Sequence, residues 1–274
     1  MDLRDPRLGV AAQEGAVALR TPTEPDLATW IVSIDRESAA LVRAVEAAGL
    51  GAPVPTCPGW QVRDLVRHLG GVHRWATVHI AEGRRERMPK QEEINLMASY
   101  PSDDLLLQRF EQEARRLRQV LAEAPVNLEC WSFLPSTYPL QFWARRQAHE
   151  TEIHRADAEI AAGSGVVGFP AEIAGDGIEE MLFGFAAVGH RPSPAPPLRL
   201  ALLAQDLPRQ WHVQLGPEGI RAERGPADAD CQVRGTASDL FLWLWNRLPK
   251  SALSVEGNQE VVKQWSQTMR VRWG

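Results

Sequence analysis

Four long stretches of the sequence carry apolar residues at intervals of three and four, the spacing that puts them on one face of a helix. They cover residues 26–49, 61–83, 102–124 and about 140–162. The second stretch shows the pattern clearly, with an apolar stripe made of Val62, Leu65, Val66, Leu69, Val72 and Trp75. Amphipathic helices of about twenty residues with intervening loops predict a helix bundle.

The pattern changes after the proline-rich segment HRPSPAPP, which a fifth helical stretch precedes. Beyond it, short near-alternating runs separated by turn residues predict antiparallel strands, at 198–206, 209–216, 219–225 and 229–235. A helix capped by Thr236 or Ser238, a short strand at LSVEG and a final helix follow. This mixture predicts an α+β unit that is distinct from the bundle.

We therefore predict a two-domain fold. An extended arm over residues 1–24 precedes a four-helix bundle with its exit helix over 25–189, a linker spans 190–197, and a small α+β domain covers 198–274.

The composition and net charge argue against several classes of protein and partner. A net charge of −5 without a basic block argues against nucleic acid, and three widely spaced cysteines argue against a disulfide framework. The opening residues MDLRDPRLGVAAQEG lack the apolar core of a signal peptide. No apolar stretch reaches the roughly 18 residues that a membrane span needs. We expect a cytoplasmic protein that acts without nucleic acid or a membrane.

The stretch RRQAHETEIHRADAE, at residues 145–159 of the fourth helix, carries the most chemistry. A helix turns about 100° per residue, so Glu150 and His154, four residues apart, share a face. His149 lies five residues before His154 and points about 140° away from it. The spacing is therefore HExxxH rather than the HExxH of zinc metalloproteases, and a metal here needs a further ligand from elsewhere.

Facing helices of a bundle supply such ligands. The second helix offers three histidines, of which His68 lies beside the apolar stripe and is our choice. The set His68, Glu150 and His154 matches the His₂Glu type of catalytic zinc site, which leaves one coordination position open. A fourth protein ligand, such as His73 swung inward, would instead indicate a closed, structural site.

Two neighbours of this set have candidate roles. Asp157, one turn after His154, is a candidate acceptor for the imidazole N–H. Arg146, one turn before Glu150, is assigned to the active site as a ligand for a substrate carboxylate, or else forms an ion pair with that glutamate. A simpler alternative stays open: the charged run is an ion network on a solvated helix face, beside a lone core histidine.

Other residues are candidates for the pocket wall. We assign Trp131, in the loop before the fourth helix, to the active site, with Trp60 and Trp143 as further wall candidates. Arg247 lies where it would reach across from the second domain, although an exposed arginine at a helix end is the simpler interpretation. Cys57 has no histidine base beside it and is left out of the site.

Three segments together resemble one family: VPTCPGWQVRDLVRHLGGVHRWA, RRQAHETEIHRADAE and VRGTASDLFLWLWNRLPKSALSVEGNQEVVKQW. The chain resembles the DinB-like helix-bundle metalloenzymes, and more closely the mycothiol-dependent maleylpyruvate isomerase family, over nearly all residues after about 25. The resemblance implies a sterol-carrier-like second domain and a divalent metal, usually zinc, on His68, Glu150 and His154. Nickel, iron and manganese are alternatives for such a set.

The resemblance also implies mycothiol as a thiol cosubstrate, bound to the metal as a thiolate. An isomerase would add the thiolate to a cis double bond, allow rotation and eliminate the thiol, whereas an S-transferase would stop after addition or displacement. We expect an S-transferase acting on a small electrophile rather than maleylpyruvate isomerase itself. The alternatives are a non-catalytic metal-binding bundle and a small-molecule-binding protein. A carrier of apolar ligands would need a cavity behind residues 236–248.

Overall fold

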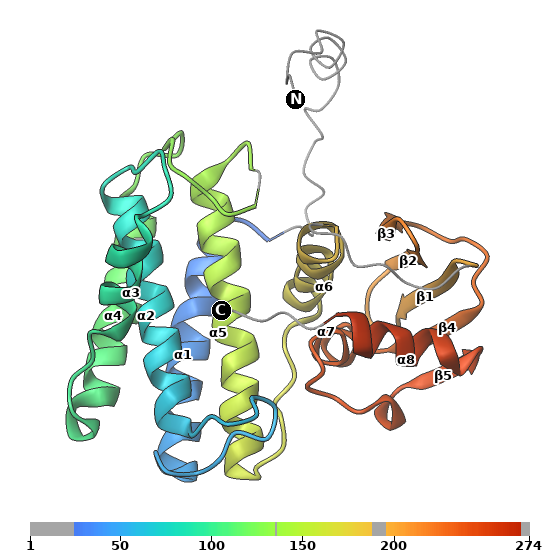
Figure 1. Cartoon of the computed structure of the whole chain (residues 1–274), viewed down its shortest axis with the longest axis horizontal. Helices are drawn as coiled ribbons and strands as arrows, with labels where there is room; N and C mark the ends of the chain where they lie inside the picture. The colour runs from blue at the N-terminus through green and yellow to red at the C-terminus, as the bar shows by residue number, and fades with distance from the viewer. Residues whose placement is uncertain (1–24, 135, 188–195, 270–274) are drawn as a thin grey trace, which may run out of the picture.

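The computed structural model describes residues 25–134, 136–187 and 196–269. Its N-terminal part is a bundle whose long helices match the four predicted stretches (Figure 1). They are α1 (Leu27–Ala48), α2 (Val62–Ala81), α4 (Asp103–Glu123) and α5 (Pro139–Ala162). The predicted arm, and the predicted linker as far as residue 195, lie outside the described residues.

Helix α5 is the central helix of the molecule. It packs against α1 and α2, while α4 closes the bundle against the same two helices. On its other side, Ile153 and Ala156 of α5 belong to the apolar core of the C-terminal domain. Because α5 is covered on both sides, its charged run is buried without interruption over residues 146–159. The interpretation of this run as a solvated helix face is therefore wrong.

A short helix, α3 (Lys90–Ala98), lies between α2 and α4. None of its side chains is buried. Because no face of α3 is buried, its sequence has no stripe of apolar residues, and this stripe is the pattern from which the four long helices are predicted.

Helix α6 (Ala171–Glu179) continues into a π-helical turn, η2 (Glu180–Phe185). Both lie between the bundle and the sheet in Figure 1. The predicted fifth helix is therefore present, but Ile178 and Met181 share the core of the C-terminal domain with Leu202 and Trp211. This segment packs mainly against the second domain, because its apolar face has the sheet and α7 as partners. Ile173 of α6 belongs to the core of the bundle.

The C-terminal domain contains one five-stranded sheet in the order β3–β2–β1–β4–β5. The strands are β1 (Leu198–Ala204), β2 (Gln210–Gly216), β3 (Gly219–Arg224), β4 (Cys231–Gly235) and β5 (Ser254–Gly257). The β1–β2, β2–β3 and β4–β5 pairs are antiparallel, as predicted. The central pair, β1 and β4, runs parallel, with Leu202 opposite Val233. Alternating polarity predicts a strand but not the direction of its neighbour.

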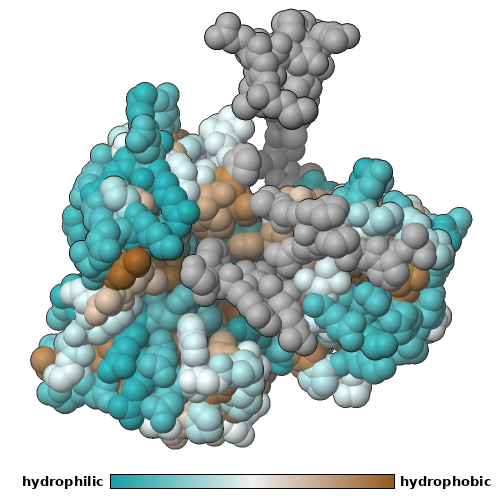
Figure 2. Space-filling view, in the orientation of Figure 1, coloured by the Kyte–Doolittle hydropathy of each residue, from teal (hydrophilic) through white to brown (hydrophobic). Residues whose placement is uncertain are grey.

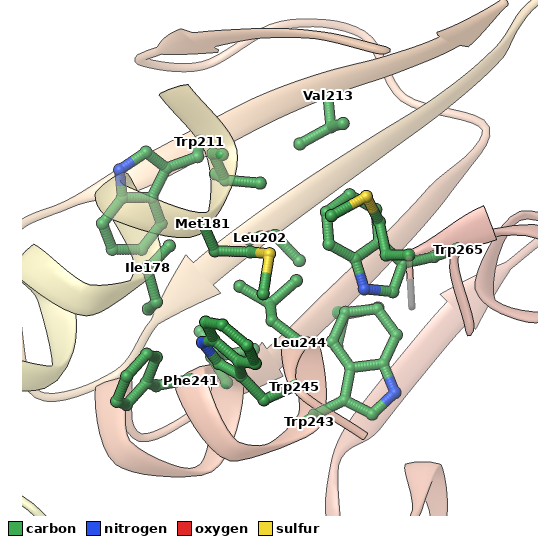
Figure 3. Packing of buried hydrophobic residues seen from close by; sticks show 14 of the residues in the cluster. Ile178, Met181, Leu202, Trp211, Val213, Phe241, Trp243, Leu244, Trp245 and Trp265 are labelled. Carbon is green, nitrogen blue, oxygen red and sulfur yellow. The ribbon is translucent and has the colours of Figure 1, made fainter. Parts of the chain in front are cut away.

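The sheet is completed by α7 (Ala237–Leu244), the short η3 (Lys250–Ala252) and α8 (Gln259–Thr268). The Thr236 hydroxyl accepts a hydrogen bond from the backbone N–H of Asp239, as predicted for the cap of α7. Figure 3 shows how the indoles of Trp243, Trp245 and Trp265 fill the core. Trp243 and Trp265 stack with their ring centroids 6.2 Å apart.

Among the described helices, none combines the length and the apolar composition that a membrane-spanning segment requires.

Candidate metal centre

Two imidazoles converge on one carboxylate oxygen between α2 and α5. The Nε2 atoms of His68 and His154 lie 3.1 Å and 3.2 Å from Oε1 of Glu150. The two rings are nearly perpendicular, with their centroids 5.0 Å apart. Each of the three side chains thus offers a ligand atom within 4.8 Å of the other two.

This donor set fits a divalent metal. Two ligands about 2.1 Å from a tetrahedral zinc ion lie about 3.4 Å apart, close to the two nitrogen–oxygen distances observed. Within the described part of the chain, no fourth side chain joins this set. His73 does not, because its Nδ1 atom bonds to the amide oxygen of Gln147 at 2.8 Å. The arrangement therefore matches an open site rather than a closed structural one.

Asp157 contacts the ring nitrogen of His154 that faces away from Glu150, as expected from their spacing. Its Oδ2 atom lies 2.9 Å from Nδ1 of His154. Burial raises the pKa of Asp157, but Arg247 and His154 outweigh burial and hold the pKa below its ordinary value. The ionised carboxylate favours the Nδ1–H tautomer of His154, which leaves the Nε2 lone pair free for a metal.

Without a metal, His154 also takes up a second proton easily. Burial lowers its pKa, but the hydrogen bonds to Asp157 and Glu150 outweigh burial and raise the pKa to about 9. Metal binding must therefore displace a proton from this imidazole near neutral pH.

Arg247 reaches the centre from the C-terminal domain. After α7, Asn246 adopts a left-handed backbone with a φ of 61°, and its side chain donates to the backbone oxygen of Met269 at 2.9 Å. This turn directs Arg247 onto Asp157, so that only 15% of its side chain is exposed. The simpler interpretation of an exposed arginine at a helix end is therefore wrong.

Arg146 forms the ion pair that its spacing allowed. Its Nη2 atom donates to Oε2 of Glu150 at 2.7 Å, and Nη1 donates to Glu180 of η2. The guanidinium lies 5.1 Å and 5.6 Å from the ring centroids of Phe185 and Trp245. Arg146 is buried behind Glu150 and is not among the cavity residues, so its position supports the ion pair rather than contact with a substrate.

A cavity of about 700 Å³ opens at the ligand set. Its wall combines the 56–60 loop, the metal-ligand set, and residues from η2, the end of α7 and α8. In Figure 2, hydrophobic side chains come to the surface between the two lobes, whose outer faces are mostly hydrophilic. Trp60 lines this cavity, as expected, with its ring centroid 5.1 Å from that of His68.

Trp131 and Trp143 lie elsewhere, so their assignment to the pocket wall is wrong. The backbone N–H of Trp131 donates to the oxygen of Arg84, beyond the C-terminal end of α2, at 2.6 Å. Trp143 is buried and donates its indole N–H to the backbone oxygen of Trp131 at 2.9 Å. Their cluster with Trp75 lies toward the end of α2 that is remote from His68.

Cys57 lines the cavity, although sequence reasoning left it out. Backbone hydrogen bonds from Cys57 to Val54 and from Trp60 to Cys57 fold its loop, and the Thr56 hydroxyl donates to Oδ1 of Asp157 on α5 at 2.5 Å. Burial, with the nearby Asp157 carboxylate, raises the pKa of the Cys57 thiol to about 12. Cys57, His154 and Asp157 form a second group of potential ligands, but Arg247 already donates to both carboxylate oxygens of Asp157.

Fold and site together define a helix-bundle protein whose candidate metal centre is closed on one side by an α+β domain. The family model described as the mycothiol maleylpyruvate isomerase N-terminal domain matches residues 31–159. The model described as the MDMPI C-terminal domain matches residues 172–264. The chain belongs to the mycothiol-dependent maleylpyruvate isomerase family, which is a family of mycothiol-dependent enzymes.

Two solved structures share this fold. Both are titled as the mycothiol-dependent maleylpyruvate isomerase, one of them as a histidine-to-alanine mutant. Their TM-scores are 0.57 and 0.58, and each alignment covers 85% of this chain and 93% of the other. The sequence identity is 14%, at which the likeness shows the fold alone. Comparison with curated protein sequences gives no match.

Proposed function

We propose that this protein is a metal-dependent enzyme that uses mycothiol as a thiol cosubstrate against a small electrophile. His68, Glu150 and His154 are the proposed metal ligands. The observation that carries the proposal is the convergence of two Nε2 atoms on Glu150 at the wall of a cavity. Zinc is the first choice for the metal, with nickel, iron and manganese as alternatives.

Bound at this position, the metal would supply a thiolate at neutral pH, by lowering the thiol pKa from its usual value of about 8.5. Neighbouring residues hold the proposed ligands in place. Asp157 fixes the orientation and tautomer of His154, and Arg146 fixes Glu150 from behind. Trp60 packs beside both imidazoles and limits their exposure to water.

Addition of the thiol to an electrophilic double bond begins both S-transfer and cis–trans isomerisation. We propose S-transfer as the main activity and keep isomerisation, which the solved relatives carry in their titles, as the second candidate. Action in the cytoplasm, without nucleic acid, is part of the same proposal. The competing hypotheses are a non-catalytic metal-binding bundle and a small-molecule-binding protein.

A spectroscopic titration tests the proposal without a substrate. The protein is loaded with Co²⁺ and titrated with mycothiol, and the S-methyl thioether of mycothiol serves as the control. A sulfur-to-cobalt charge-transfer band should appear with the thiol, and neither with the thioether nor in His68→Ala. Cobalt-loaded protein that gives no band with mycothiol would refute thiol activation and favour the non-catalytic alternatives.

A further inference from the structure

The charges that the described residues bring to the cavity wall are paired within the protein. Among the described residues of the wall, Arg247 is the one arginine or lysine. Its Nε and Nη2 atoms donate to the two carboxylate oxygens of Asp157, and Nη1 donates to the backbone oxygen of Trp245 at 2.6 Å. Glu150 has Arg146 behind it. Because Arg146 also pairs with Glu180, a divalent metal that carries Glu150 and one thiolate would be neutral as well.

The rest of the wall is mainly apolar. Its large side chains are those of Trp60, Ile153, Met181, Leu244, Trp245 and Met269. An uncharged ligand gains free energy by covering such surface. A carboxylate placed against the same surface loses its hydration and finds no unpaired cation among the described residues of the wall, so it binds less tightly than an uncharged group.

Two lysines lie nearby, but in an adjoining groove of about 570 Å³. Lys263 has 61% of its side chain exposed and pairs with Glu260, while Lys250 donates to Gln259 at 3.2 Å. Their ammonium groups remain in contact with solvent and have partners of their own. The groove suits the polar part of a thiol cosubstrate better than the reacting end of an electrophile.

We propose that the electrophile is an uncharged molecule with an apolar body, such as a neutral α,β-unsaturated ester, rather than a dicarboxylate. This inference rests on the proposed function. In the addition, the thiol gives up its proton to solvent, the thiolate sulfur forms a bond to the β-carbon, and the electron pair of the double bond moves to the α-carbon. The α-carbon then takes a proton back from solvent, which completes the neutral thioether. Nothing is oxidised or reduced.

The preference for an uncharged electrophile can be tested with matched product adducts, because their binding does not depend on how fast each electrophile reacts with a thiol. Mycothiol adducts of dimethyl maleate and of maleate differ only in whether two carboxyl groups are methylated. Isothermal titration of the zinc-loaded protein should show at least tenfold tighter binding of the diester adduct. Equal or tighter binding of the diacid adduct would overturn the inference. If the cobalt titration still gave a thiolate band, that result would leave the proposed function standing.

A pair of variants tests the electrostatic cause. Ser266 of α8 lines both the cavity and the adjoining groove. Ser266→Lys adds a cation without a partner, whereas Ser266→Gln adds comparable bulk without charge. The lysine variant should bind the diacid adduct at least tenfold more tightly than the glutamine variant does. Equal affinity of the two variants for the diacid adduct would contradict the charge argument.

Discussion

Asp157 of α5 and Arg247 beyond α7 form a two-point ion pair that joins the bundle to the C-terminal domain directly behind a proposed metal ligand. Nε lies 2.9 Å from Oδ1, and Nη2 lies 3.0 Å from Oδ2. The same carboxylate accepts from Nδ1 of His154. One buried side chain therefore links the position of the second domain to the orientation of the metal site.

Arg247→Gln should lower the free energy of unfolding by about 3–5 kcal/mol, because it leaves the Asp157 carboxylate buried without its main cation. Urea unfolding measures this loss. The control is Arg221→Gln, since Arg221 pairs with Glu218 at a site where both side chains are at least 70% exposed. That variant should lose no more than about 1 kcal/mol. Similar losses in the two variants would show that the interdomain pair contributes little.

Asp157→Asn should weaken zinc binding about 10- to 100-fold, because His154 loses the carboxylate that fixes its tautomer. Competition with a chromophoric chelator measures the affinity. Asp103→Asn is the control, because Asp103 pairs with Arg63 and Arg67 on α2 and is not among the potential ligand groups. Unchanged affinity in Asp157→Asn would remove Asp157 from the account of the site.

Arg146→Gln should weaken metal binding and leave the KM for the electrophile unchanged, because Glu150 loses the hydrogen-bond donor that fixes the orientation of its carboxylate. Arg145→Gln, which disrupts the neighbouring ion pair to Asp176, is the matched control and should retain metal affinity. A raised KM with unchanged metal affinity would instead restore the substrate-binding role that the sequence allowed for Arg146.

His73 predicts a pH dependence of stability. Burial lowers the pKa of His73 to about 4, and its Nε2 atom has no partner among the described residues. As the pH falls below the ordinary value of about 6.5, the unfolded chain takes up the proton first, so the contribution of His73 to stability is lost between about pH 6.5 and 4. The loss from pH 7.5 to pH 5 is on the order of 2 kcal/mol.

His73→Asn removes the titrating ring and places an amide N–H near the position that faces Gln147. Urea unfolding at pH 7.5 and pH 5 should show that the variant loses on the order of 2 kcal/mol less than the wild type. An identical pH loss in both proteins would mean that His73 is not the titrating group.

Local periodicity predicted the features that depend on one helix at a time. The four long helices follow from their apolar stripes, and Glu150 and His154 share a face because they are four residues apart. The choice of His68 needed one step more, namely that α2 faces α5. The structure brings these three side chains together as expected.

Features that depend on distant segments were not predictable in this way. Arg247 is about ninety residues from Asp157, so no spacing rule connects them. Trp131 is an aromatic residue of the kind that often lines pockets. The path of its loop, however, places it at the C-terminal end of α2, away from His68. The parallel pairing of β1 and β4 is likewise decided by the path of the chain between them.

The metal content of the purified, zinc-loaded protein tests the central claim most directly. The wild type should hold about one zinc per chain, and His68→Ala and Glu150→Ala should lose it, since each removes one of three donors. His212→Ala is the control, because His212 bonds to the backbone oxygen of Asp228 and belongs to no ligand group; it should keep the metal. A wild type that stays metal-free after loading, or variants that retain the metal, would contradict the assignment of the site.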